Sequence, residues 1–335
     1  MKRIISLLLA LALTLSLTAC TVPAEKADGG KLQIVTTLFP YYDFARTIAQ
    51  DRADVTLLLS PGREAHSFEP TPLDAVTISE ADVFLYNGGE GEYWVESMLD
   101  AAGEHIAVAS RMMDYVDALN EEYVEGMQGA DGHDHDHEHG SHDDHDHDHE
   151  EDEHDSDEIE YDEHIWTSPK NAVVLCRAVC DAICRADAEN AAFYRANCEN
   201  YCAQLEDLDA RFAALCESAP RRLLIFADRF PMLYFCREYG LDYRAAFHGC
   251  SGDTEPSLAT IKFLIDKVED ENIPVVYTID FGTKKVAAVV SECTGAAIET
   301  LYSMQTVSRA DFDAGGTYLT LMERNFEALR KGLNE

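Results

Sequence analysis

The chain has 335 residues, of which 46% are hydrophobic, so it is long enough to form two domains with buried cores. Its 63 Asp and Glu residues outnumber 26 Lys and Arg residues and give a formal net charge of −37. This charge argues against nucleic acid as a partner, because the phosphates would be repelled, and it suits a cation as the ligand.

The N-terminal region has the features of an export signal. Two basic residues precede the apolar stretch Ile4–Leu17, which is too short to span a membrane. Small residues then lead to Cys20, so residues 1–20 are expected to be a bacterial lipoprotein signal with a lipid anchor on Cys20. An ordinary signal peptide with a coincidental cysteine is the alternative. Residues 21–30 would form a polar tether, which places the protein on the outer face of the cytoplasmic membrane.

The next part of the chain alternates strands with helices. Apolar and β-branched runs predict strands at Leu32–Leu38, Ala53–Leu59, Asp82–Tyr86 and His105–Ala109. Helices are predicted between them at Tyr41–Gln50, Leu73–Glu80 and from Glu92 to about Ala101. This alternation across short turns indicates a parallel sheet with helices on both faces.

An acidic tract, Asp131–Glu163, interrupts this first lobe. Nine of the chain's 13 histidines lie in it: His133, His135, His137, His139, His142, His145, His147, His149 and His154. The tract has almost nothing apolar to bury, so a disordered loop is predicted from about residue 125 to 160. Many of the imidazoles are uncharged at neutral pH, which favours several weak metal sites that capture or sense a cation. An inert acidic linker is the alternative.

Two long helices are predicted after the tract. Ser168 and Pro169 form a strong helix start, and this helix runs to about Arg185. The second helix, Ala188–Ser218, contains no Gly or Pro and is expected to be a rigid connection between two lobes.

Cysteines recur every four residues on both helices, which places each set along one helix face. They are Cys176, Cys180, Cys184, Cys198 and Cys202. Buried free thiols are the preferred interpretation, and disulfides or metal ligation are the alternatives.

The remaining chain repeats the strand–helix alternation. Strands are predicted at Arg222–Ala227, Asp242–Phe247, Pro274–Ile279 and Ala297–Leu301, and helices at Pro231–Tyr239, Pro256–Asp270, Thr283–Cys293 and Gly316–Leu333. The predicted fold class is therefore α/β, with two four-stranded, mostly parallel sheets flanked by helices. The expected boundaries are 31–187 for the first lobe, 188–218 for the connecting helix and 219–335 for the second lobe.

Two histidines outside the acidic tract are the first candidates for metal ligands. His66 follows the second predicted strand, and His164 lies just before a helix start. Both are on connections, where binding residues concentrate. Ligands of open α/β sheets bind beyond the carboxyl ends of the strands, so the site is expected in the cleft between the lobes.

At these histidines the sequence resembles the zinc- and manganese-binding lipoproteins of bacterial ABC importers. PGREAHSFEPTP around His66 is similar to the family's first-ligand loop, and DEHIWTSPKNA around His164 to its second-ligand motif. Downstream matches are YGL at Tyr239–Leu241, EPS at Glu255–Ser257 and TYLTLMERN at Thr317–Asn325. The resemblance covers the chain from about Leu32 onward. A His-rich insertion at this place is typical of the zinc members.

The chain departs from the family pattern at the remaining ligands. The resemblance implies a His or Glu after the first strand of the second lobe, but Arg229 stands there, or Asp228 after a shift of one residue. Arginine cannot coordinate a cation, whereas Asp228 can supply an oxygen ligand. The acidic ligand of the last cleft loop would fall near Tyr302, so Asp280 is a substitute candidate. His248, at another strand end, is a further one.

The resemblance implies a binding protein that captures Zn²⁺ outside the membrane and delivers it to an ABC permease. The protein is expected to be a monomer. Carboxylate ligands would also admit Mn²⁺. A zinc-dependent hydrolase is one alternative, although the sequence contains no HExxH or GxSxG motif. A surface zinc store or adhesin, with the acidic tract as its working part, is the other.

Overall fold

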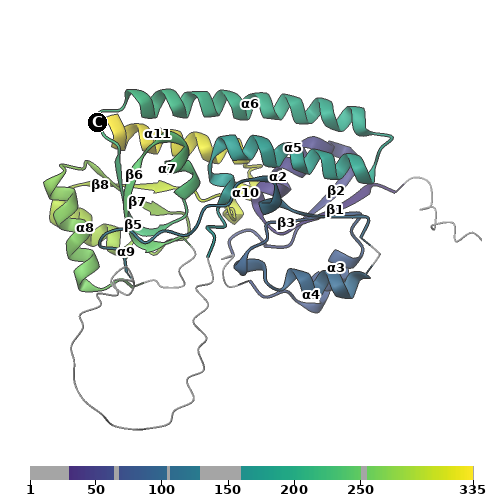
Figure 1. Ribbon diagram of the computed structural model, residues 1–335, viewed down its shortest axis with the longest axis horizontal. Coiled ribbons are helices and arrows are strands. Elements are labelled where there is room, and N and C mark those ends of the chain that lie inside the picture. Colours follow the sequence, from purple (N-terminus) through teal and green to yellow (C-terminus); the bar gives the residue numbers. More distant parts are fainter. Residues whose placement is uncertain (1–29, 64–67, 104–105, 129–159, 250–254, 335) are drawn as a thin grey trace, which may run out of the picture. The chain divides into compact units, whose positions relative to one another are not determined.

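The alternating strands and helices form two parallel sheets in the computed structural model. The structure describes residues 30–63, 68–103, 106–128, 160–249 and 255–334. The chain divides into two units, Met1–Lys31 and Leu32–Glu335. The following description concerns the second unit (Figure 1). Among the described residues, no helix has both the length and the apolar character needed to cross a membrane.

The first lobe contains a four-stranded sheet of order β2-β1-β3-β4 in which all pairs are parallel. Its strands are β1 (Leu32–Thr36), β2 (Ala53–Leu57), β3 (Val83–Tyr86) and β4 (Val108–Arg111). Its helices are α2 (Phe39–Ala49), α3 (Pro72–Ser79) and α4 (Val95–Ala102). The strand predicted at His105–Ala109 begins three residues later, because β4 pairs in register with β3 from Val83 opposite Val108.

The second lobe repeats this arrangement with the order β6-β5-β7-β8, again all parallel. Its strands are β5 (Leu223–Phe230), β6 (Asp242–His248), β7 (Val275–Ile279) and β8 (Ala297–Leu301). Its helices are α7 (Leu233–Tyr239), α8 (Leu258–Asp270), α9 (Lys285–Thr294), α10 (Arg309–Asp313) and α11 (Tyr318–Asn334). The prediction that the first of these strands ends at Ala227 was wrong, because a register shift between Phe226 and Arg229 lets β5 continue to Phe230.

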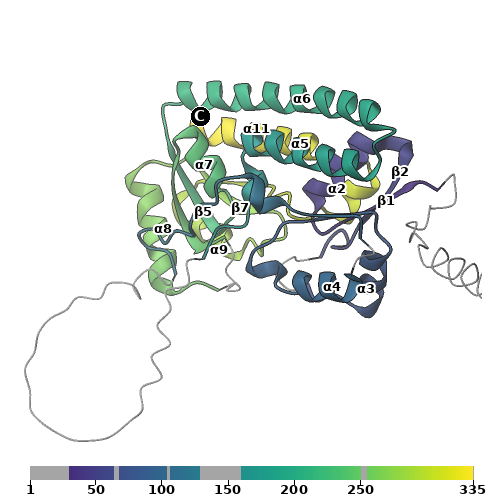
Figure 2. The same ribbon diagram turned by 45° about the vertical axis from the view of Figure 1, so that its right-hand side comes forward.

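Two long helices follow the first lobe. Helix α5 (Pro169–Ala186) packs on that lobe, and α6 (Ala191–Ser218) connects it to the second. The predicted start of α5 is confirmed, since Ser168 accepts a hydrogen bond from the Asn171 backbone N–H and Pro169 occupies the first turn. Helix α6 has 28 residues, which corresponds to about 42 Å at 1.5 Å per residue. Figures 1 and 2 show it extending over both sheets.

Buried side chains on α6 recur at helical spacing and contact both lobes. Tyr201 donates a hydrogen bond to Asp43 of α2 in the first lobe, and Tyr239 of α7 donates one to Asp209. One continuous hydrophobic core includes residues of both sheets and of α5 and α6. The long helix predicted between the lobes is therefore packed against each of them.

A segment of the first lobe crosses to the second before the acidic tract. This crossing segment, residues 119–128, makes defined contacts as far as Gln128, although the predicted loop begins near residue 125. The Leu119 backbone N–H donates to the Tyr234 hydroxyl, and the Gln128 backbone N–H donates to the Ala246 carbonyl. The crossing segment thus brings first-lobe residues against α7 and β6.

Candidate metal site

His164 is held in a fixed position at the junction of the two lobes. It precedes the short turn η6 (Ile165–Thr167) that leads into α5, and only 1% of its surface is exposed. The Asp162 carboxylate accepts a hydrogen bond from the His164 backbone N–H at 2.8 Å and lies 3.1 Å from the ring Nδ1. The ring also packs edge-on against Trp166.

The electrostatic environment of His164 is strongly acidic. Burial lowers the pKa of its imidazole, but the carboxylates of Asp162, Glu121 and Glu163 outweigh this effect, so the pKa lies above the ordinary value of 6.5. Burial in turn raises the pKa of Glu163, whose Oε1 accepts a hydrogen bond from the Gly91 backbone N–H. A site with this much negative field favours a bound cation.

A pocket joins His164 to the carboxyl ends of second-lobe strands. Its lining includes His164, Asp280 directly after β7, and Ser303 and Gln305 after β8. Arg229, which stands at the family's third-ligand position, lines the pocket as well. Parallel α/β sheets bind ligands at the carboxyl ends of their strands, where this pocket lies. The predicted candidates His164 and Asp280 therefore share one pocket.

The two aspartates predicted as metal ligands, Asp280 and Asp228, have different surroundings. Asp280 accepts a hydrogen bond from the Ser303 backbone N–H at 2.7 Å, which fixes one carboxylate oxygen at the pocket wall. Asp228 lies within β5, accepts from the Arg229 backbone N–H and is packed against Gly282. It does not belong to the residues that line the His164 pocket.

His248, the further candidate, lies at the end of β6 and contacts the crossing segment. Its Nδ1 is 2.9 Å from the Glu121 carboxylate, whose side chain is 5% exposed. Its ring also lies against Tyr123. Glu121 influences both His164 and His248, and it was not identified from the sequence. It is separated from His164 by the acidic tract, so no local pattern relates the two.

Gly249, beyond β6, allows the second lobe to approach the imidazole closely. A Cβ at this position would lie 3.1 Å from His164 Nδ1 and 2.9 Å from the Phe230 carbonyl oxygen, which is too close for a larger residue without displacement. This contact was also missed, because a glycine after a strand is an ordinary turn signal.

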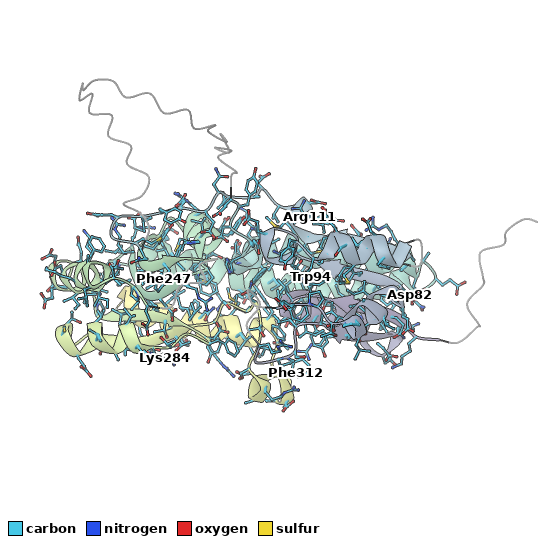
Figure 3. All side chains as sticks on the ribbon, turned by 90° about the horizontal axis from the view of Figure 1, so that it is seen from below. Asp82, Trp94, Arg111, Phe247, Lys284 and Phe312 are labelled. Atoms are coloured by element: carbon cyan, nitrogen blue, oxygen red, sulfur yellow. The ribbon has the colours of Figure 1, made fainter. Side chains whose placement is uncertain are left out.

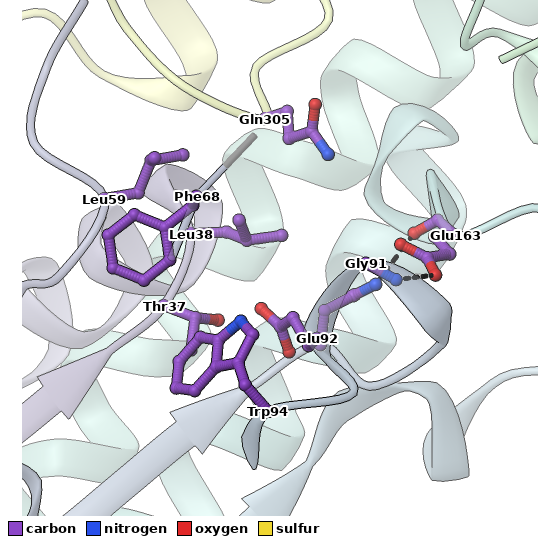
Figure 4. A pocket seen from close by; sticks show the side chains of 10 residues that line it. Thr37, Leu38, Leu59, Phe68, Gly91, Glu92, Trp94, Glu163 and Gln305 are labelled. Atoms are coloured by element: carbon purple, nitrogen blue, oxygen red, sulfur yellow. Dashed lines mark hydrogen bonds between the residues drawn. The ribbon is translucent and has the colours of Figure 1, made fainter. Parts of the chain in front are cut away.

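A second pocket adjoins the site and is lined mainly by first-lobe residues, together with Gln305 of the second lobe (Figure 4). Among the described residues, Thr37 Oγ1, Glu92 Oε1 and Trp94 Nε1 are buried without a hydrogen-bond partner. Figure 4 shows these three groups on one side of the pocket. Burial raises the pKa of Glu92 to about 7. Figure 3 shows Trp94 on the first lobe and Phe247 on the second.

Several predicted site residues lie outside the described part of the chain. They are His66, the nine histidines of the acidic tract and the acylation candidate Cys20. Their predictions remain as stated.

Comparison with known proteins relates the whole of this architecture to metal uptake. A family model described as zinc-uptake complex component A, periplasmic (ZnuA), matches residues 34–332. The chain is 31% identical over 316 residues to a protein named high-affinity zinc uptake system protein ZnuA from Bacillus subtilis, covering 93% of this chain and 91% of that protein. It is 30% identical to the zinc-binding lipoprotein AdcA of Streptococcus pneumoniae, of which it spans 61% while 99% of this chain is covered.

Solved structures agree with the sequence relatives. The metal-dependent lipoprotein YcdH of Bacillus subtilis superposes with a TM-score of 0.72 at 29% identity, covering 90% of this chain and all of that one. The Zn(II)-bound ZnuA-like domain of Streptococcus pneumoniae AdcA gives a TM-score of 0.70 at 26% identity, covering 91% of this chain and all of that domain. The predicted two-lobed fold and the resemblance are therefore confirmed, and the chain belongs to the ZnuA family of zinc-uptake complex components.

Proposed function

We propose that this chain is the extracytoplasmic binding component of an ABC importer and that it carries Zn²⁺ between its lobes. The observation that supports this most directly is the buried His164, which shares a pocket with Asp280 at the carboxyl ends of second-lobe strands. The zinc named in the descriptions of the matching family and relatives supports the choice of cargo.

The Asp162–His164 pair has the chemistry of a zinc-binding imidazole. Histidines that bind zinc commonly donate their second ring N–H to a carboxylate, which fixes the tautomer and raises ligand basicity. Asp162 lies in position to accept from Nδ1, at 3.1 Å, so Nε2 would be the atom that binds the metal.

We propose a ligand set of His66, His164 and Asp280, with Asp228 as an alternative oxygen ligand. Two imidazoles with one or two carboxylates suit tetrahedral Zn²⁺. Oxygen ligands also suit Mn²⁺, so discrimination against Mn²⁺ would be weaker than in a three-histidine site. Arg229, which lines the same pocket, would balance part of the carboxylate charge.

The acidic tract would capture or sense zinc at several weak sites. The chain would be anchored by a lipid on Cys20 and act as a monomer that delivers its ion to a membrane permease. The signal-like N-terminal sequence and the description of one relative as a lipoprotein support this location.

Zinc titration of three variants tests the proposal. We expect the chain lacking residues 131–156 to retain one tightly bound Zn²⁺, because the cleft ligands remain. His164→Ala in that background should weaken binding by more than about 100-fold. Loss of a carboxylate that only orients a ligand costs about 10- to 100-fold, and this substitution removes the ligand itself. His105→Ala, which alters a histidine outside the proposed sites, serves as the control.

Loss of all tight binding on deletion of the tract would contradict the proposal and identify the protein as a zinc store. Equal affinity of the His164→Ala variant and its control would exclude His164 as a ligand.

A further inference from the structure

Five of the chain's 10 cysteines lie on the paired helices α5 and α6. They are Cys176, Cys180, Cys184, Cys198 and Cys202, all of them buried and free. Helix α5 extends from the first lobe, and α6 is the helix packed on both lobes. The prediction that these helices carry buried free thiols is confirmed. Burial does not by itself require the sulfur atoms to lie close together.

Three of these thiols meet at one point. The Sγ atoms of Cys176, Cys198 and Cys202 all lie within 4.8 Å of one another. Cys198 and Cys202 Sγ are 3.8 Å apart. A Zn–S bond of about 2.3 Å in tetrahedral geometry separates two sulfur ligands by about 3.8 Å. The Cys198–Cys202 pair therefore already has the spacing of zinc ligands, and the other two sulfur–sulfur distances are no greater than 4.8 Å.

The thiols also contact backbone carbonyls of α5. Cys198 Sγ donates a hydrogen bond to the Cys176 carbonyl oxygen at 3.8 Å, and Cys202 Sγ donates one to the Val173 carbonyl oxygen at 3.9 Å. The guanidinium of Arg177 interacts electrostatically with Cys198 and Cys202. A thiophilic cation would replace the thiol protons at this point.

We propose that Cys176, Cys198 and Cys202 form a second metal site, which binds Zn²⁺ through three thiolates and fastens α5 to α6. Soft thiolate ligands select Zn²⁺ or Cu⁺ over harder cations. Three thiolates with Zn²⁺ leave a charge of −1, whereas Cu⁺ would leave −2, and a larger buried charge is more costly. The nearby Arg177 offsets the smaller charge.

Binding at this site is coupled to folding rather than to transport. The three side chains are at most 2% exposed, so the ion enters as the helices assemble, and the displaced thiol protons pass to solvent. The bound ion would stabilise the helix that holds the lobes together. This site is independent of the cleft, whose ligands are imidazole and carboxylate.

Cobalt is the probe for this site, because thiolate-to-Co²⁺ charge transfer gives an intense near-ultraviolet absorption that imidazole and carboxylate ligands do not give. The reduced full chain is unfolded and refolded with Co²⁺. We expect this absorption at one equivalent per chain, displaced by Zn²⁺ and lost in Cys202→Ala. Cys216→Ala, an equally buried thiol on the same helix, should leave it unchanged.

Absence of the thiolate absorption in the wild-type chain, or its persistence in Cys202→Ala, would overturn the proposal. Should Cys202→Ala not fold, alkylation of the wild-type chain during slow unfolding provides the second measurement. Zinc should delay labelling of Cys176, Cys198 and Cys202 relative to Cys216. Equal labelling of all four, or a disulfide among the three, would exclude the site. Both measurements are unaffected by failure of zinc binding in the cleft.

Discussion

At the scale of single residues, Asp162 determines how His164 presents its ring. We predict that Asp162→Asn weakens zinc binding in the tract-deleted chain by about 10- to 100-fold, because the imidazole loses its orienting carboxylate. It should also lower the pKa of His164, to which Asp162 contributes the largest raising effect. Competition with a chelator gives the affinity, and NMR titration of the ring gives the pKa.

Asp114→Asn is the matched control, because Asp114 is an exposed aspartate of the same lobe paired with Arg111. If both substitutions altered zinc affinity equally, the orienting role of Asp162 would be wrong.

Glu92 gives a second prediction at this scale. Its pKa of about 7 in the folded chain exceeds the ordinary value of 4.5, so the carboxyl contributes fully to stability at low pH and this contribution is lost as the pH rises from 4.5 through 7. The difference between these two pKa values corresponds to about 3 kcal/mol. Relative to wild type, Glu92→Gln should therefore gain up to about 3 kcal/mol of unfolding free energy between pH 4.5 and 8.

Urea unfolding of both proteins across this pH range measures the difference. Glu96→Gln, at an exposed glutamate four residues later, is the matched control. A pH-independent difference for Glu92→Gln would show that Glu92 does not titrate abnormally.

At the scale of secondary structure, a buried carboxylate joins three helices. Asp43 of α2 accepts hydrogen bonds from the Tyr201 hydroxyl of α6 at 2.6 Å and from the Tyr318 backbone N–H of α11 at 2.9 Å. We predict that Tyr201→Phe reduces the unfolding free energy by about 1.5–3 kcal/mol, the range for a hydrogen bond to a charged group. Chemical denaturation measures this, and Tyr93→Phe, at a tyrosine that is 76% exposed, should change it little. An equal effect of the two substitutions would disprove the role of the Asp43 junction.

Sequence patterns predicted most of these elements because each has a strong local signal. Ser168 and Pro169 fixed the start of α5, and the absence of Gly and Pro identified α6. The short helix α10 was missed, since five residues carry little periodic signal. The extension of β5 past Ala227 was missed because it depends on a register shift against β6.

The site could be predicted only in part, for the same reason. His164 was recognisable from its place before a helix start, and Asp280 from its place after a strand. The contribution of Glu121 depends on the crossing segment, which reaches the second lobe through tertiary contacts alone. Placement of Asp228 within β5, away from the lining of the His164 pocket, likewise follows from pairing between strands.

At the scale of the whole molecule, zinc affinity should depend on pH because protons compete for imidazole. Because the pKa of His164 lies above 6.5, protons already compete with zinc at pH values above 6.5, and the affinity falls further as the pH decreases. Each pH unit below the pKa costs about tenfold per histidine ligand. We predict a loss of at least about tenfold for the tract-deleted chain between pH 7 and 5, measured by chelator competition. His164→Ala should reduce this dependence on pH, and unchanged affinity at pH 5 would argue against imidazole ligands.

The most direct measurement is a crystal structure of the zinc-loaded, tract-deleted chain with anomalous scattering recorded at the zinc edge. The account predicts an anomalous peak in the pocket between the lobes, within bonding distance of His164 and Asp280, with His66 completing the approach from the first lobe. A peak that lies away from His164, or a structure in which the His66 and His164 side chains do not converge on one ion, would contradict it.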